Sequence, residues 1–154
     1  MAQTTASGGT NVVICLDNSP YSEKAIEWYI SFFHRPDHHV HLVHVLEWWG
    51  DVGRMMSPQR IHELVQETDQ KAEDLGKRFV QLFQSKGISS VDFHKVHGKD
   101  VWHEIIECAT KVHAKLIVIG SRGQGTIRRT LMGSNSDAVV HHSHIPVVVC
   151  KINE

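Results

Sequence analysis

The sequence predicts a single α/β domain in which an open, five-stranded parallel sheet carries helices on both faces. Five short apolar segments alternate with four helical segments between residues 11 and 152. Residues 11–17 form a continuous apolar run, as expected of a strand that is buried on both faces, whereas residues 91–98 alternate between apolar and polar side chains. Because a helix joins each pair of consecutive strands, right-handed crossovers and parallel pairing are favoured. In such sheets, ligands bind beyond the carboxyl ends of the strands, where the strand order reverses.

The composition is that of an ordinary globular protein. Of the 154 residues, 41% are hydrophobic and 21% are charged, and the formal net charge is −1. This balance gives no basic field, so nucleic acid is not expected as a partner. No segment approaches the roughly 20 apolar residues of a membrane span, so no membrane partner is expected. Residues 1–10 are small and polar and lack the apolar core of a secretory signal, which predicts a disordered tail followed by one domain over 11–154. Three cysteines lie far apart without a CxxC pair, which favours a reducing compartment and a cytoplasmic location.

The first half of the chain is expected to contain two strands and two helices. Residues 11–17 and 39–47 are the strands. Ser19 is expected to cap a helix that has Pro20 at its first position, and the pair Ser57-Pro58 begins a longer helix in the same way. The apolar positions expected to be buried are Ala25, Ile26, Tyr29, Ile30 and Phe33 in the first helix, Val40 and Leu42 in the second strand, and Ile61, Leu64, Val65, Ala72, Leu75, Phe79, Leu82 and Phe83 in the second helix.

The second half continues the alternation. Gly87 is expected to end the long helix. The segments 91–98, 115–120 and 146–152 are the remaining strands. Asp100 is expected to cap a helix that runs to about residue 113, and a short helix begins near Ser134.

Two glycine-rich turns separated by a basic stretch follow the fourth strand, in the segment 120–137 (GSRGQGTIRRTLMGSNSD). Amide groups at a turn and at a helix N-terminus form an anion site, and glycine lets the backbone approach a phosphate closely. The segment is not a P-loop, because Thr126 stands where the lysine belongs, and it is not a dinucleotide fingerprint, which would follow the first strand. Ser134 offers a hydroxyl, and positive charge could come from Arg122, Arg128 and Arg129.

The spacing G-x2-G-x9-G-S, through Gly120, Gly123, Gly133 and Ser134, resembles the universal stress protein family. The flanking segments VVICLDNSPYSEKAIEW, HLVHVLE and the final PVVVC resemble the same family, so the likeness covers nearly the whole chain. It implies a Rossmann-like fold of the adenine-nucleotide alpha hydrolase type, a cytoplasmic location and a dimer. It also implies ATP or AMP as the bound nucleotide, with Mg²⁺ as an optional companion.

Carried over position by position, the resemblance implies a nucleotide site. Asp17 and Val40 would hold the adenosine, and the ribose and phosphates would contact Ile119, Gly120, Gly123, Gly133, Ser134 and Asn135, with Arg122 and Ser136 from the same segment. The chain departs from the usual pattern at Cys15, where proline or alanine is common, and at Asn135, where valine is common. From the residues alone, Asp17 could be only a turn former, and Gly120 and Gly123 only turn glycines.

Three functions are compatible with these features. The leading one is a regulatory protein that binds ATP or AMP in the stress response and passes its state to unknown client proteins. The second is a slow ATPase or phosphotransferase, and the third is a dimeric scaffold with a vestigial nucleotide pocket. The segment 120–136 contains no acid, which disfavours efficient hydrolysis, so no catalytic residue is expected.

The thirteen histidines raise the question of a metal site. His38, His39 and His41 do not all share one face of a strand, and neither an acid nor a cysteine completes a spaced set, so no metal site is expected. Trp48 and Trp49 follow the second strand and could either fill the space under a loop or stack near a bound base. The last strand is expected at an edge of the sheet, where two copies would pair as a homodimer through Val147–Val149.

Overall fold

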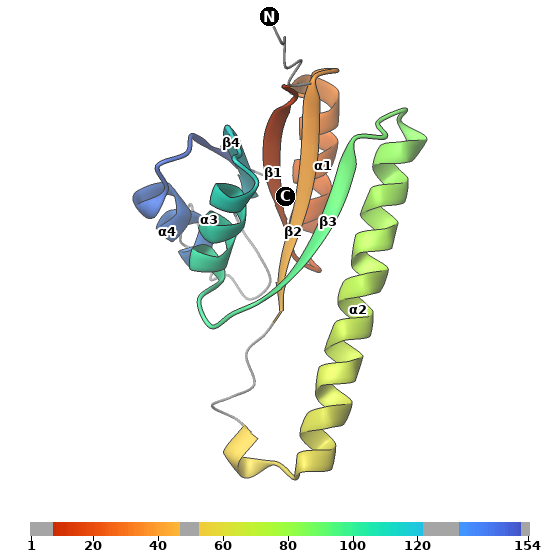
Figure 1. Ribbon diagram of the computed structural model, residues 1–154, viewed down its shortest axis with the longest axis vertical. Coiled ribbons are helices and arrows are strands. Elements are labelled where there is room, and N and C mark those ends of the chain that lie inside the picture. The colour runs from red at the N-terminus through yellow and green to blue at the C-terminus, as the bar shows by residue number, and fades with distance from the viewer. Residues whose placement is uncertain (1–7, 47–52, 122–132, 152–154) are drawn as a thin grey trace, which may run out of the picture.

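The computed structural model describes residues 8–46, 53–121 and 133–151. Five strands form one parallel sheet in the order β3-β2-β1-β4-β5 (Figure 1). This arrangement confirms the expected fold class, and the strand order reverses between β1 and β4. The strands are β1 (Thr10–Leu16), β2 (His38–Leu46), β3 (Val91–His97), β4 (Leu116–Gly120) and β5 (Val147–Cys150). The domain was expected to start at residue 11, but β1 already includes Thr10.

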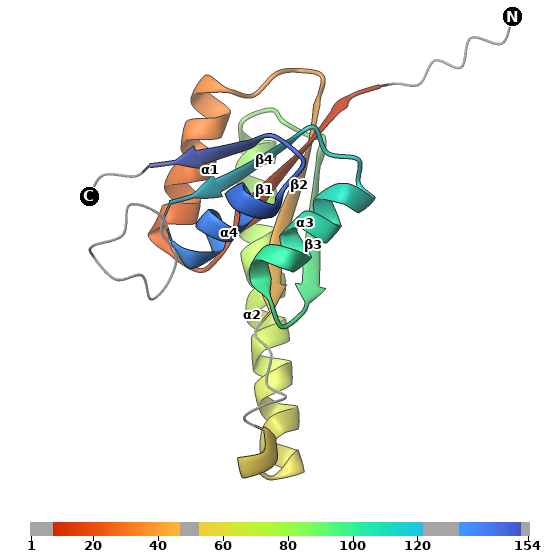
Figure 2. The same cartoon turned by 90° about the vertical axis from the view of Figure 1, so that its left-hand side faces the viewer.

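Helices cover both faces of the sheet (Figure 2). Alternate side chains of each strand point to opposite faces, so the sheet contributes to two apolar cores. One core joins Val12, Ile14 and Leu42 to Tyr29 and Phe79 of the first two helices, and the other packs strand residues against the last two helices. The helices are α1 (Pro20–Phe32), α2 (Pro58–Ser85), α3 (Val101–Lys111) and α4 (Ser134–His142), with a short 3₁₀ turn, η1 (Gly53–Met55).

The helix signals in the sequence act in different ways. Ser57 caps α2 as expected, because its hydroxyl accepts the Arg60 N–H at 3.2 Å. Ser19 precedes α1 but makes no such bond, and its hydroxyl instead donates to Asp17. Gly87 follows α2 with φ of +79°, a left-handed conformation that favours glycine. Asp100 is the N-cap residue of α3, as expected, but its side chain makes no capping hydrogen bond. The helix ends at Lys111.

The amino-terminal part of α2 and the adjoining η1 project beyond the sheet (Figures 1 and 2). As a result, Val65 is 44% exposed, although its helical spacing predicts a buried position. Phe33 is also more exposed than expected, at 38%, because it follows the last turn of α1. The buried part of α2 is its carboxyl-terminal half, with Ala72, Leu75, Phe79 and Phe83.

Strand β5 lies at an edge of the sheet, as expected, and pairs with β4. The Ile117 N–H donates to the Pro146 carbonyl and the Ser121 N–H to the Cys150 carbonyl, each at 2.9 Å. Within the described ranges, no helix combines the length and apolarity that a membrane crossing needs.

Candidate functional site

A cavity of about 670 Å³ opens at the carboxyl ends of β1, β2 and β4. The space lies at the reversal of strand order between β1 and β4, which is where parallel sheets bind ligands. Its walls come from the β1–α1 turn, the middle of α2, the start of α3 and the start of α4. The volume is within the range of small-molecule sites, about 300–1,000 Å³.

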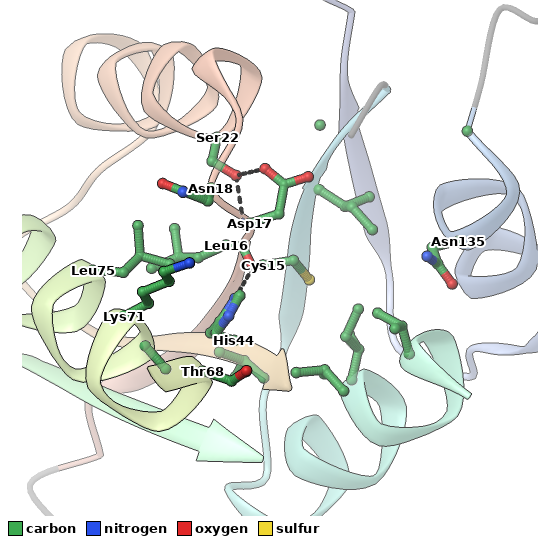
Figure 3. Close-up of a pocket in the computed structure, with 18 of the residues that line it drawn as sticks. Cys15, Leu16, Asp17, Asn18, Ser22, His44, Thr68, Lys71, Leu75 and Asn135 are labelled. Carbon is green, nitrogen blue, oxygen red and sulfur yellow. Dashed lines mark hydrogen bonds between the residues drawn. The ribbon is translucent and has the colours of Figure 1, made fainter. Parts of the chain in front are cut away.

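Asp17 borders this cavity and is held in place by the first turn of α1 (Figure 3). Its Oδ1 accepts the Ser19 N–H at 2.9 Å and the Ser22 hydroxyl at 2.8 Å, and the Ser19 hydroxyl also donates to it. The Ser22 hydroxyl in turn accepts the Asp17 N–H at 2.8 Å. The carboxylate therefore has one orientation before any ligand arrives.

Gly120 and the start of α4 border the same cavity. Gly133 is the N-cap residue of α4, and its carbonyl accepts the Ser136 hydroxyl and the Asp137 N–H, each at 2.9 Å. The amides that precede Asp137 in the helix have no acceptor within it, because the first helical hydrogen bond begins at Asp137. Ser134 and Asn135 are exposed on this end of the helix, so the start of α4 offers donors and a partial positive charge.

His44 was not predicted as a site residue, although it lines the cavity from the carboxyl end of β2. Its Nδ1 lies 2.9 Å from the Leu16 carbonyl. A carbonyl oxygen only accepts, so Nδ1 carries the proton, and neutral His44 has Nε2 as a hydrogen-bond acceptor. Val45 from the same strand end, and Thr68 and Lys71 from α2, also line the cavity. The rule that ligands bind at the carboxyl ends of strands points to His44 and Val45.

Val40 is not at this site. Its side chain is fully buried, and it is aligned with Val12 near the amino end of the sheet. The resemblance placed Val40 in the site, but the start of a parallel strand lies at the end of the sheet opposite to the cavity. The residues of β2 that line the cavity are Val43, His44 and Val45.

Cys15 lines the cavity with a thiol that stays protonated at neutral pH. Burial raises the pKa of this thiol well above its usual value, and Cys108 and Asp17 raise it further. A protonated thiol is a poor nucleophile, so Cys15 contributes shape to the wall rather than covalent chemistry. All three cysteines are free.

A sequence profile described as the Universal stress protein family matches residues 9–151. The chain belongs to this family. Universal stress protein MJ0531 of Methanocaldococcus jannaschii is 30% identical over 142 residues, which cover 91% of this chain and 81% of that protein. An uncharacterized protein of Schizosaccharomyces pombe, C167.05, is 27% identical over 153 residues. These residues cover 97% of this chain but only 25% of the Schizosaccharomyces pombe protein, so this chain matches one part of a longer protein there.

Solved structures show the same fold. Hypothetical protein MJ0577 aligns with a TM-score of 0.80 and 22% identity, over 95% of this chain and 98% of that one. A universal stress protein in complex with cAMP aligns with a TM-score of 0.68 and 18% identity, over 92% and 96% of the two chains. The universal stress protein from Archaeoglobus fulgidus in complex with dAMP aligns with a TM-score of 0.60 and 23% identity, over 91% and 96%.

Most of the universal stress protein site expected from the sequence borders this one cavity. The residues concerned are Asp17, Ile119, Gly120, Gly133, Ser134, Asn135 and Ser136. Arg122 and Gly123 lie outside the described residues, as do Arg128, Arg129, Trp48 and Trp49.

Proposed function

We propose that this universal stress protein binds ATP or AMP in the cavity between β1 and β4 and acts as a regulator in the stress response. One observation carries the proposal. The cavity at the switch point is bordered on one side by a fixed carboxylate, Asp17, and on another by Gly120, Gly133 and the amino end of α4. Similar folds solved as complexes with cAMP and dAMP support an adenine nucleotide as the ligand class.

The two sides of the cavity suit different parts of a nucleotide. The start of α4 and the glycine backbone offer donors to phosphate oxygens. Asp17 and the Nε2 of His44 offer acceptors, which suit ribose hydroxyls and the amino group of adenine. Mg²⁺ is usually held by one or two carboxylates together with substrate phosphates, and Asp17 and Glu67 are the carboxylates on the described wall of the cavity. A magnesium ion would therefore arrive with ATP rather than occupy a site of its own.

The proposed role is binding without efficient turnover. Phosphoryl transfer needs a group that positions the attacking water, usually together with a metal. The hydrogen bonds from Ser19 and Ser22 already occupy Oδ1 of Asp17, which suits a ligand-holding role. Client proteins would then respond to whether the cavity is filled. The free cysteines support a reducing location, the cytoplasm, and the β5 edge supports a homodimer through Val147–Val149.

The decisive experiment identifies the ligand of the full chain. Freshly purified protein is denatured by heat, and the released small molecules are identified by mass spectrometry. An adenine nucleotide in near-equal amount to protein is the expected result. In parallel, ligand-free protein is melted with ATP, ADP, AMP and, as a control, GTP. Saturation at a hundredfold above Kd adds about 2.7 kcal/mol of stability.

The outcomes separate the three functions. A melting shift with adenine nucleotides and no phosphate release supports the regulatory role. Sustained phosphate release at about 1 s⁻¹ or faster would identify an enzyme instead. No released nucleotide and no shift at millimolar concentrations would leave the scaffold with a vestigial pocket.

A further inference from the structure

A group of polar side chains lies on the sheet away from the cavity, on strands β2 and β3. His39 and His41 alternate along β2, and Asp92 and His94 alternate along β3. The register pairs His41 with Asp92 and Val43 with His94, so all four side chains project from the same face. The sequence predicted no metal site because the segment that forms β2 contains no acid beside its histidines. The neighbouring strand supplies the acid that β2 lacks.

The ring nitrogens and the carboxylate of this group converge. His39 Nε2 lies 2.6 Å from Asp92 Oδ2, and His41 Nδ1 lies 2.9 Å from His94 Nε2. The rings of His39 and His41 are stacked, with centroids 4.6 Å apart. One ligand atom from each of His39, His41 and Asp92 lies within 4.8 Å of the other two. Two ligands of a tetrahedral ion, each bound at about 2.1 Å, are themselves about 3.4 Å apart, so small side-chain rotations would close the site.

Asn11 on β1 fixes which nitrogen of His41 is available. The Asn11 amide nitrogen donates to the Val112 carbonyl at 2.8 Å, which directs Oδ1 to His41. Oδ1 accepts from His41 Nε2 at 3.2 Å, so Nε2 carries the proton. The lone pair of His41 is therefore on Nδ1, directed at His94. Histidine ligands in metal sites usually donate their second N–H to such an oxygen.

We propose that His39, His41, Asp92 and His94 bind one divalent transition-metal ion, with Zn²⁺ as the best match to these ligands. Imidazole nitrogens together with one carboxylate suit zinc, copper, nickel or iron, whereas Mg²⁺ prefers oxygen ligands. Nε2 of His39 carries a proton because Asp92 Oδ2 only accepts, and Nε2 of His94 donates to His41. Each of these two rings becomes a ligand by moving its proton from Nε2 to Nδ1, which leaves its charge unchanged. The site is open to solvent on one side, because the side chains of His39 and Asp92 are 37% and 59% exposed while His41 is 8% exposed.

This site is independent of the proposed nucleotide binding. The cavity uses the carboxyl end of β2, Val43–Val45, whereas the metal ligands lie on the amino half of that strand and on the edge strand β3. Metal binding is therefore testable in protein that contains no nucleotide, and either proposal could fail alone.

The test uses the full chain without a histidine tag, stripped with a chelator and dialysed. Zn²⁺ is titrated by calorimetry, and Co²⁺ is added separately because its visible absorption is intense only in a tetrahedral site. We expect one ion per chain, a tetrahedral Co²⁺ spectrum that Zn²⁺ abolishes, and a higher melting temperature with Zn²⁺. Excess Mg²⁺ should not compete.

Two variants at the exposed side of the site test the ligands without disturbing the buried ring of His41. His39→Ala and Asp92→Asn should each weaken Zn²⁺ binding by at least about tenfold and weaken the Co²⁺ absorption. Asn11→Ala, which removes the orienting oxygen, should weaken binding by about 10–100-fold. The matched control is His62→Ala, an exposed histidine on α2, which should bind as the unaltered protein does.

Three results would overturn the proposal. The first is the absence of saturable Zn²⁺ binding to the unaltered chain. The second is unchanged affinity in both His39→Ala and Asp92→Asn. The third is loss of binding in the control or in His144→Ala while these two variants still bind, because the ion would then be held elsewhere.

Discussion

Ser22 contacts Asp17 twice, because its hydroxyl accepts the Asp17 N–H and donates to the Asp17 carboxylate, each at 2.8 Å. Asp17 follows the last residue of β1, and Ser22 lies in the first turn of α1, so this pair joins the strand end to the helix start. Both residues border the cavity. The turn that orients the carboxylate is thus part of the site itself.

Ser22→Ala should reduce both stability and nucleotide binding. Ser22 is 6% exposed, and its loss removes both hydrogen bonds between its hydroxyl and Asp17, at a cost of about 1–3 kcal/mol. For a domain of this size, a loss of 1 kcal/mol lowers the melting temperature by about 2–4 °C. Ser31→Ala, at an exposed serine of the same helix, is the control and should leave both properties unchanged. Nucleotide affinity equal to that of the control would show that Asp17 needs no support from Ser22.

Gly133→Val should abolish the melting shift with ATP or AMP while the fold persists. Gly133 is buried at the N-cap of α4 and borders the cavity, so a branched side chain there would occupy the space beside the helix amides. Thermal melts with and without nucleotide measure the effect. Val140→Ala alters an exposed residue of the same helix and should retain the shift. If Gly133→Val still binds, the phosphates lie elsewhere in the cavity.

Local sequence signals were sufficient for the fold. Apolar runs and, for β3, an alternating pattern identified the strands, and the Ser57-Pro58 start of α2 has the cap hydrogen bond that this pair predicts. Contacts between distant residues were harder to predict. Asp92 and His94 meet His39 and His41 only because β3 pairs with β2 in one particular register, which no single segment encodes. The exposure of Val65 likewise depends on α2 being longer than the sheet it covers, which helical periodicity cannot reveal.

The sequence predicted best the part of the site in which backbone N–H groups would contact the ligand. Glycine spacing located the start of α4, because a helix N-terminus and a close backbone approach depend on local sequence. Val40 was misplaced because it lies at the start of β2, whereas the cavity lies at the carboxyl end of that strand. His44 and Lys71 line the cavity through the packing of β2 against α2, so the sequence offered little sign of Lys71.

Tyr29 links two histidines in the α1 core, and Tyr29→Phe should lower the free energy of unfolding by about 1–3 kcal/mol. The Arg35 N–H donates to His38 Nδ1 at 3.4 Å, so this nitrogen is an acceptor, and the Tyr29 hydroxyl donates to it at 2.7 Å. The tyrosine oxygen is 3.2 Å from His34 Nδ1, from which it accepts. Burial lowers the pKa of His38, which agrees with a neutral ring that accepts a hydrogen bond from the tyrosine hydroxyl.

Urea denaturation of the unaltered protein and of Tyr29→Phe measures this loss in the free energy of unfolding. Tyr21→Phe, at a half-buried tyrosine in the same helix, is the matched control and should cost less. Equal stability losses in the two variants would mean that the buried hydroxyl of Tyr29 contributes no more to stability than the half-buried hydroxyl of Tyr21 does.

The open edge of β5 predicts how two copies would pair as a homodimer. Pro146 and Cys150 direct their carbonyls to β4, and successive residues of a strand direct their backbone groups to opposite sides. Val147 and Val149 therefore direct their N–H and C=O groups to the open edge, where a second copy would pair around a two-fold axis. Val149→Pro removes one of these N–H groups at a position where an edge strand tolerates proline, so we expect a monomer by light scattering. Val149→Ala loses similar packing but keeps the N–H, and it should remain a dimer. A dimer in both variants would place the interface on another surface, whereas a monomer in both would assign the association to the valine side chain rather than to strand pairing.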